Sequence, residues 1–265
     1  MKRCNASRFK AATVVVSLLI AAFIVLVLLG VVTHSPLDVF IECLFSEEIQ
    51  FAIRLSILTS IISTLFCILV AVPVAYALAR YTFPGKFVMN MVMDIPMALP
   101  PLVAGVGLLL FFGVSPMGKS LAAMGLTFVF TPLGIIMAQF FVNLPYMLRV
   151  ARSTFQSVNP RYENVAKTLG CTDAQAFWRV TLPMSWNGLL AGAVITWSKG
   201  IGEFGAALML AGATRMKTET LPLSLFLNMS TGKLEVGISA ATILILISIV
   251  SLYVFERYGG STHAY

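Results

Sequence analysis

The chain has 265 residues, of which 58% are hydrophobic and only 11% are charged, and its formal net charge is +7. The charged fraction is about half that of a typical soluble domain, and the apolar fraction is well above the usual share. These values exclude an ordinary water-soluble fold and indicate an all-α integral membrane protein.

Six stretches are long and apolar enough to be membrane spans. A spanning helix needs about 20 apolar residues because it rises about 1.5 Å per residue through roughly 30 Å of hydrocarbon. We predict a single domain over 1–265, with spans at approximately 11–32, 51–79, 94–113, 122–148, 187–213 and 236–255. The first span follows basic residues, as a secretory signal would, but it is longer than the roughly 7 to 15 residues of a signal core. We interpret it as a retained span.

The third span begins with Pro96, Pro100 and Pro101. Each proline removes an amide donor and crowds the preceding helical turn, so a regular helix cannot contain all of them. We predict that this span begins broken or kinked. The break either lines a cavity, which makes Pro100 a candidate for the translocation path, or is satisfied by neighbouring helices.

The distribution of Lys and Arg predicts how the spans are oriented, because positively charged loops stay on the cytoplasmic side. With the amino terminus inside, the cytoplasmic segments hold most of these residues, whereas the outer segments hold only Lys119, Arg215, Lys217 and Lys233. We expect a multi-pass protein of the cell membrane with both termini in the cytoplasm. This topology accounts for the positive charge without a nucleic-acid partner.

The cytoplasmic loop at 149–186, between the fourth and fifth spans, has helical signals of its own. Asn159 before Pro160 is typical of a helix start, and Gly170 is typical of the left-handed residue beyond a helix end. Thr172 and Gln175 have the spacing of a capping box, which predicts a second short helix that ends at Pro183. The loop is therefore predicted to be a helical hairpin.

The first helix of this hairpin has one apolar face. That face carries Tyr162, Val165, Ala166 and Leu169, while Arg161, Glu163, Asn164 and Lys167 lie elsewhere. A helix of this length is marginal alone in water, so another surface must pack against it. The composition leaves the membrane surface and a partner protein equally open.

The segment from Glu163 to Pro183 resembles the cytoplasmic signature of ABC importer permeases, written EAA, three residues, G, nine residues, I-x-L-P. Gly170 and Pro183 are in register with it, and Asn164 takes the acidic position. Glu163 lies one residue upstream and is the alternative source of that charge. The resemblance implies the six-span type I importer architecture, with the first hairpin helix seated in a cleft of an ATP-binding subunit. The implied docking residues are Arg161, Tyr162, Glu163, Asn164, Val165, Ala166, Leu169, Gly170 and Pro183.

Two charged residues, Lys199 and Glu203, fall inside the predicted fifth span, where charge is costly. On a continuous helix they would share a face and could neutralise each other. Nearby glycines permit close helix approach or expose backbone amides to an anion. The pair either fixes helix packing or takes part in the pathway. The candidate path residues are Lys199, Gly202, Glu203, Gly205 and Pro100.

Three further segments are similar to sequences in molybdate, tungstate and sulfate permeases, and the likeness covers nearly the whole chain beyond residue 50. They are Pro96–Pro101, Gly202–Gly205 and Thr218–Leu223. The general likeness is greatest to the molybdate and tungstate permeases. It implies a channel-forming permease subunit that takes up molybdate or tungstate, with sulfate or thiosulfate as the alternative.

The resemblance also implies the partners: a second copy of the permease, two cytoplasmic ATP-binding cassette subunits and an extracytoplasmic oxyanion-binding protein. We expect a transport subunit, not an enzyme, without an ATP-binding motif, so that ATP and Mg²⁺ are held by the partner subunit. No cofactor or metal is expected on this chain. A stand-alone secondary transporter or channel is a weaker alternative, since Glu203 and Asp94 are its only support.

Overall fold

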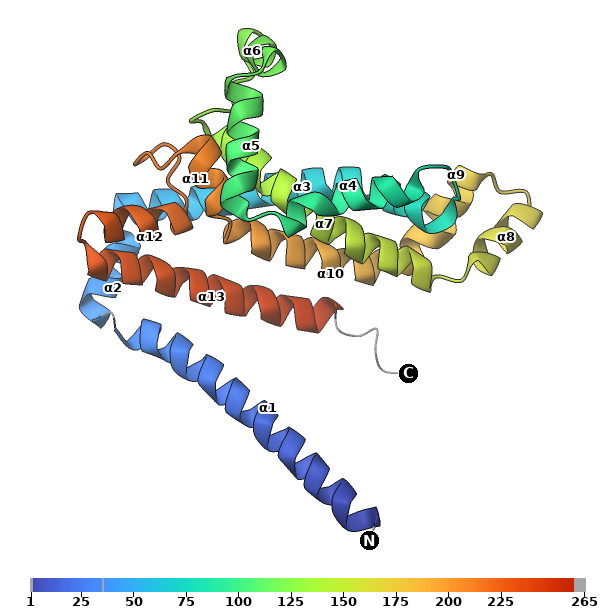
Figure 1. The fold of residues 1–265 in the computed structure, drawn as a ribbon, viewed down its shortest axis with the longest axis horizontal. Coiled ribbons are helices and arrows are strands. Elements are labelled where there is room, and N and C mark those ends of the chain that lie inside the picture. Colours follow the sequence, from blue (N-terminus) through green and yellow to red (C-terminus); the bar gives the residue numbers. More distant parts are fainter. Residues whose placement is uncertain (1, 35, 260–265) are drawn as a thin grey trace.

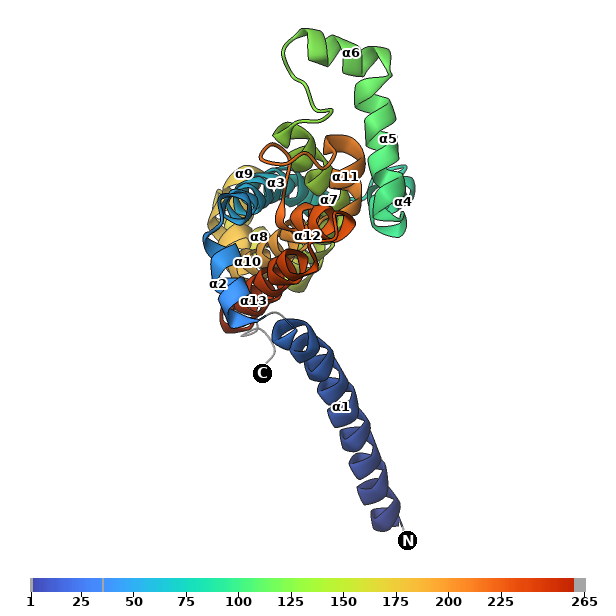
Figure 2. The ribbon, with the colours of Figure 1, turned by 90° about the vertical axis from the view of Figure 1, so that its left-hand side faces the viewer.

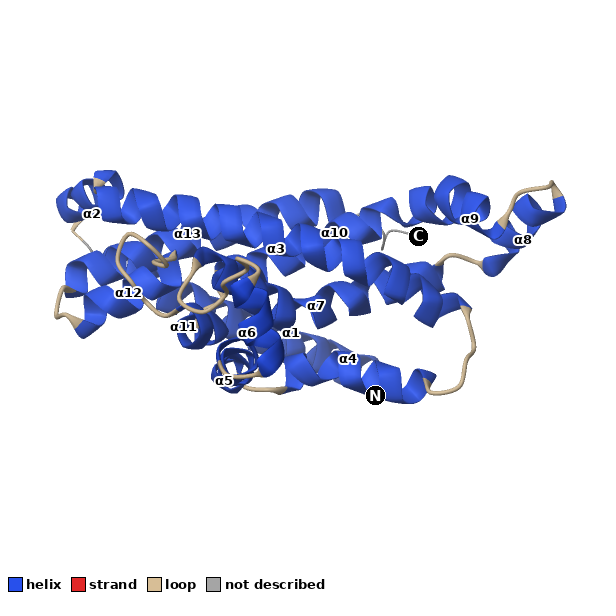
Figure 3. Ribbon diagram, turned by 90° about the horizontal axis from the view of Figure 1, so that it is seen from above, coloured by secondary structure: helices blue, strands red, loops and turns tan. Residues whose placement is uncertain are grey.

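The computed structural model describes residues 2–34 and 36–259, and over these residues every regular element is a helix (Figure 3). The elements in chain order are α1 (Lys2–Thr33), α2 (Leu37–Phe45), α3 (Glu47–Arg80), α4 (Lys86–Ala98), α5 (Pro101–Gly113), α6 (Pro116–Ala123), α7 (Pro132–Ser157), α8 (Pro160–Thr168), α9 (Asp173–Ala176), the π-helical segment η1 (Phe177–Thr181), α10 (Leu182–Ile201), α11 (Gly205–Ala211), α12 (Leu221–Ser230) and α13 (Leu234–Gly259).

The body of the molecule is an elongated bundle in which α3, α7, α10 and α13 lie roughly along the long axis (Figure 1). α3 packs along α7, and α10 packs against both. The close approach follows from small buried residues on α3, among them Cys67, Ala71 and Ala75, which face Met147 and Phe155 of α7. The helical hairpin of α8 and α9 lies at one end of the bundle, and α2 and α12 lie at the other (Figure 3).

The described helices confirm a multi-pass membrane protein but do not reproduce the predicted number of six spans. Four are long and apolar enough to cross a bilayer, at Phe9–Thr33, Glu47–Arg80, Pro132–Ser157 and Leu234–Tyr253. The pair α4 and α5 raises the number to five if it forms one span. The predicted fifth span is divided between α10 and α11, which explains part of the difference.

The third and fourth predicted spans differ from the structure in their limits. α4 and α5 are bent by 109° at Leu99 and Pro100, so the predicted break is present but the span is not one straight helix. The fourth span begins at Pro132 and not near residue 122. Thr131 caps that helix with its hydroxyl, which accepts a bond from the Gly134 amide at 3.4 Å, and a loop precedes it.

Two parts of the chain extend from the bundle. α1 leaves the body beside α13, and its apolar stretch has no buried share in this chain (Figure 2). α5 rises steeply from the bundle and carries α6 at its far end (Figures 1 and 2). Both expose large apolar side chains, such as Leu19, Phe23, Val106 and Leu110. These surfaces fit lipid or other protein chains better than water.

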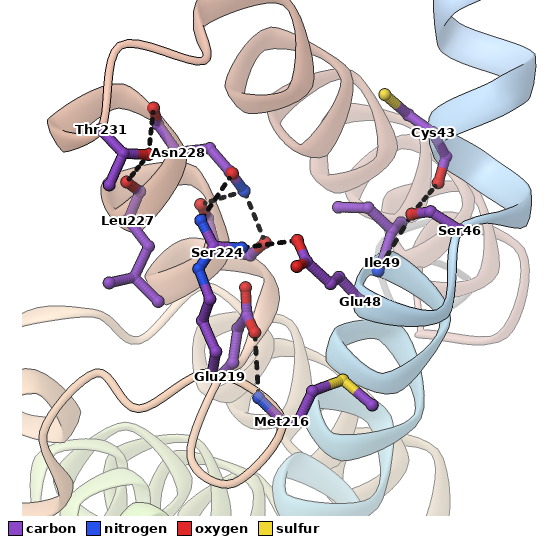
Figure 4. Close-up of polar contacts among 11 residues, drawn as sticks. Cys43, Ser46, Glu48, Ile49, Met216, Glu219, Ser224, Leu227, Asn228 and Thr231 are labelled. Carbon is purple, nitrogen blue, oxygen red and sulfur yellow. Dashed lines mark hydrogen bonds and ion pairs between the residues drawn. The ribbon is translucent and has the colours of Figure 1, made fainter.

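The end with α2 and α12 is held by a polar network (Figure 4). Arg215 donates to Glu48 of α3 at 2.5 Å and to Asn228 of α12 at 3.1 Å. The buried Glu219 accepts a bond from the Met216 amide at 3.2 Å. α12 packs on α13 and α3, so much of its apolar surface is already covered within the chain.

Candidate functional site

The first helix of the hairpin is fixed at both ends by its own sequence. Asn159 accepts a bond from the Arg161 amide at 3.0 Å, and Pro160 occupies the first turn of α8. Gly170 adopts a φ of 92°, while the Cys171 amide donates to Ala166 and the Gly170 amide to Lys167, both at 3.0 Å. This is a Schellman end, and glycine suits its left-handed position. The predicted helix and its glycine turn are confirmed.

The second helix begins as predicted but does not end at Pro183. Thr172 and Gln175 form both bonds of the capping box. The helix then passes through η1 directly into α10, where Pro183 lies in the first turn. In η1 the Leu182 amide donates to the Phe177 carbonyl, and this wider π turn accommodates the proline without a break. The hairpin is therefore continuous with a long helix of the bundle.

The outer face of α8 is apolar and exposed. Tyr162, Val165 and Leu169 are 54%, 58% and 81% exposed, and Arg161 and Asn164 beside them are also exposed. Ala166, predicted on the same face, is instead buried against the body. Exposed apolar groups on a short charged hairpin indicate a surface that another molecule covers. We call Tyr162, Val165 and Leu169 the docking face.

An ion pair between Lys167 and Asp173 closes the hairpin across its glycine turn. The hydrogen bond from Lys167 to Asp173 raises the pKa of the ammonium group. Both side chains are exposed, so the pair adds little to stability.

Glu163 lies on the opposite side of α8 and is only 4% exposed. Its carboxylate pairs with Arg80 at 2.7 Å and accepts bonds from Thr181 at 2.8 Å and from Tyr76 at 3.1 Å. The alternative in which Glu163 supplies the acidic contact to a partner is therefore wrong, because its oxygens are occupied inside the chain. The sequence reasoning missed Arg80, Tyr76 and Thr181. The one available signal was that Glu163 and Ala166 share a stripe beside the apolar face.

The candidate path residues are not arranged as predicted. α10 ends at Ile201, so Glu203 lies beyond the helix, where its Oε1 accepts a bond from the Ala206 amide at 2.8 Å. Lys199 instead places its Nζ 4.4 Å from the centre of the Tyr146 ring. No ion pair joins Lys199 and Glu203 in the described part of the chain. Such a pair would need a continuous helix, and α10 is interrupted at Gly202.

Gly205 and the turn at Pro100 are brought together by the crossing of α5 and α11. A Cβ atom on Gly205 would lie 3.0 Å from both the Leu102 amide nitrogen and the Pro101 Cβ. A Cβ atom on Gly105 would lie 2.7 Å from the Met209 Cβ and 2.8 Å from the Ala206 Cα. The two interrupted helices thus meet backbone to backbone. Gly202, by contrast, has no close neighbour outside its own helix end.

Side-chain hydrogen bonds, which hydropathy cannot predict, join α7 to α10 and to α4. Gln139 of α7 donates to the Gly200 carbonyl at 2.8 Å, which holds the last turn of α10. Arg149 of α7 donates to Asp94 of α4 at 3.0 and 3.1 Å, and Arg152 donates to Asn90 at 2.8 Å. Asp94 is therefore paired, which weakens its assignment as an ion-coupling carboxylate.

The expectation that the chain contains no phosphate-loop pattern is wrong for the sequence itself. Residues 113–120, Gly-Val-Ser-Pro-Met-Gly-Lys-Ser, match it. The structure places them at the end of α5 and the start of α6, whereas a phosphate loop follows a strand. The Val114 and Gly118 amides donate to Leu110 and to the Ser115 hydroxyl, so these amides are not free for phosphate. The match is coincidental.

Comparison with known proteins identifies the family. The family described as "Binding-protein-dependent transport system inner membrane component" matches residues 68–258. The sulfate transport system permease protein CysW of Synechocystis sp. is 31% identical over 84% of this chain and 81% of its own length. The molybdenum transport system permease protein ModB of Mycobacterium bovis is 33% identical over 77% of each chain.

Solved structures agree on the fold. A bacterial ABC transporter involved in the import of the acidic polysaccharide alginate matches with a TM-score of 0.69 and 16% identity, over 86% of this chain and 84% of that one. The MetNI methionine ABC transporter matches with a TM-score of 0.62 and 17% identity, over 83% of this chain and 100% of that one. The chain therefore belongs to the binding-protein-dependent transport system inner membrane components, as an ABC importer permease related to the sulfate and molybdenum permeases.

Proposed function

We propose that this chain is the channel-forming permease subunit of an importer that takes up molybdate or tungstate, driven by ATP hydrolysis in a separate subunit. The observation that carries the coupling to ATP is the docking face, because it is apolar, exposed and located within the signature segment. Sulfate or thiosulfate is the second candidate substrate, since the similar permeases include both sulfate and molybdenum systems.

The proposed assembly contains two copies of this permease, two ATP-binding cassette subunits that hold ATP and Mg²⁺, and an extracytoplasmic oxyanion-binding protein. One alginate transporter with the same fold was solved with a substrate-bound periplasmic protein, which supports the last of these partners. The hairpin end of the bundle then faces the cytoplasm together with both termini, as the distribution of positive charge favours.

Transport would be driven through the hairpin. Closure of the ATP-binding subunits would displace α8, and the displacement would pass to the bundle through the chain segments at each end of the hairpin. One end joins α7 through Val158 and Asn159, and the other continues through η1 into α10. The ATP-binding subunit would hydrolyse ATP, and this chain would form the path through which the substrate crosses the membrane.

The substrate is tested by uptake of labelled molybdate into vesicles that contain the complete complex, with tungstate and sulfate as competitors. We expect tungstate to compete at concentrations similar to molybdate, and sulfate to require at least about a hundredfold excess, which corresponds to about 2.7 kcal/mol. Equal competition by sulfate would reject the molybdate assignment in favour of the second candidate. An ATP-binding subunit that does not co-purify with the chain would reject the importer itself.

The proposed path includes Lys199, Gly202, Glu203, Gly205 and Pro100. Lys199 is exposed in the single chain and carries an ammonium group within the membrane segment, where it could attract an anion. Glu203, whose carboxylate accepts a bond from the Ala206 amide in the first turn of α11, would instead maintain the shape of the interrupted helix.

Lys199→Gln is expected to reduce oxyanion uptake at least about tenfold, because a hydrogen bond to a charged group is worth about 1.5–3 kcal/mol. Initial uptake rates in vesicles measure the effect. Lys119→Gln is the matched control, since Lys119 lies in α6, away from the proposed path. Uptake by Lys199→Gln at the control rate would remove Lys199 from the path.

A further inference from the structure

We propose that Glu163 is a positioning residue that fastens α8 to the bundle, so that the docking face and three long helices move as one body. This inference rests on the proposed function, because it assigns Glu163 a part in the coupling of ATP hydrolysis to transport. The ATP-binding subunit would contact the outer side of α8, and Glu163 would act from the inner side.

The Glu163 carboxylate joins several elements of the fold. Glu163 belongs to α8, its partners Tyr76 and Arg80 belong to the last turns of α3, and Thr181 ends η1. Arg80 also donates to the Val158 carbonyl at 2.8 Å, which lies in the link between α7 and α8. A single buried ion pair therefore ties the hairpin to α3, to the end of α7 and to the start of α10.

An aromatic cluster lies next to the ion pair. Tyr76 packs edge-on against Phe155 of α7 and Phe177 of η1, with ring centres 5.8 and 4.7 Å apart. Phe155 and Phe177 are in turn 6.0 Å apart. Tyr76, which donates to Glu163, is thus also the centre of an aromatic cluster formed by α3, α7 and η1. Such a junction resists bending, because its members are packed as well as hydrogen-bonded.

The ion pair between Arg80 and Glu163 is buried. The side chains of Arg80 and Glu163 are 9% and 5% exposed, and the carboxylate has three donors. A buried charged pair is weak support for stability on its own, since hydrophobic residues can often replace it at no cost. Its geometry is better suited to holding one orientation of α8. Without the pair, a force on the docking face would rotate α8 on its glycine turn instead of moving the bundle.

The test uses the complete complex in proteoliposomes, with the binding protein and whichever of molybdate, tungstate or sulfate the unmodified complex transports. The measured quantity is the number of anions taken up per ATP hydrolysed. Glu163→Gln is expected to keep the ATP-binding subunit bound and hydrolysis active, while this ratio falls at least about tenfold, in line with the loss of a charge-assisted bond. Thr168→Ala, on an exposed position of the same helix, is the control and should keep the ratio.

Removal of one buried partner can also prevent folding, so a paired variant is needed. Arg80→Met with Glu163→Leu removes both charges and all their bonds. We expect the yield of assembled complex to recover while the ratio stays at least about tenfold low. An unchanged ratio in this double variant would overturn the inference, as would a loss of uptake and hydrolysis in equal proportion. If the unmodified chain retains no ATP-binding subunit at all, the proposed function fails instead, before any variant is compared.

Discussion

Leu169→Glu is expected to lower the affinity of the complex between this chain and its ATP-binding subunit at least about thirtyfold, because a central interface residue contributes about 2 kcal/mol or more. Leu169 is the most exposed side chain of the docking face, at 81%. In the proposed complex it is covered by the partner, and a carboxylate there would be buried without a donor. The measurement is the amount of ATP-binding subunit retained on the tagged, purified permease over a range of subunit concentrations.

The matched control for this variant is Gln156→Glu. Gln156 is exposed near the end of α7, so the change adds the same charge close to the hairpin but outside the docking face. The control should retain the subunit as the unmodified chain does. If Leu169→Glu also retains it fully, then the docking face does not contact the ATP-binding subunit, and lipid is the better candidate for covering it.

The parts of the hairpin that could be predicted from sequence depend on neighbours a few residues apart. Asn159 caps α8, Gly170 ends it and Thr172 starts the next helix, and each signal lies within the turn that it controls. The prolines at Pro100 and Pro101 predicted a break for the same reason, since their effect on the backbone is local. Residues within one turn therefore determine the ends of α8, the start of α9 and the break before α5.

The errors arose where a residue's role depends on distant elements. Glu163 was placed among the docking residues, but its partner Arg80 is 83 positions away and turns it inward. A continuous helix would let Lys199 and Glu203 neutralise each other, but α10 ends at Gly202 between them. Pro183 was expected to end a helix, but the π turn of η1 accommodates it. In each case packing decided between conformations that the sequence left open.

The crossing of α5 and α11 was also beyond sequence reasoning, because it depends on which helices meet. Gly205 was chosen as a path residue for its possible closeness to an anion, but the structure uses it for closeness to Pro101 and Leu102. No local pattern in the sequence marks Gly105 on the facing helix, although its contact of 2.7 Å is closer than the 3.0 Å of Gly205. The two residues together let the interrupted helices approach without side chains between them.

Gly105→Leu is expected to separate α5 from α11 and to lower the apparent melting temperature of the purified protein by at least about 5 °C, since overpacking costs about 1–3 kcal/mol or more. Even the first added carbon would lie 2.7 Å from the Met209 Cβ and 2.9 Å from the Ala206 carbonyl oxygen. Backbone atoms cannot withdraw as the end of a side chain can, so the helices must move. Uptake should fall with stability, because both interrupted helices belong to the proposed path.

Gly107→Leu provides the comparison, because it makes the same change two positions away in the same helix. A Cβ atom there has no neighbour within 4 Å, so the larger side chain fits without displacing the backbone. Both variants lose the same glycine flexibility and gain the same apolar volume. A difference in melting temperature and uptake therefore measures the crossing alone. Equal values for the two variants would show that α5 and α11 do not need their close contact, and the path would have to be sought elsewhere in the bundle.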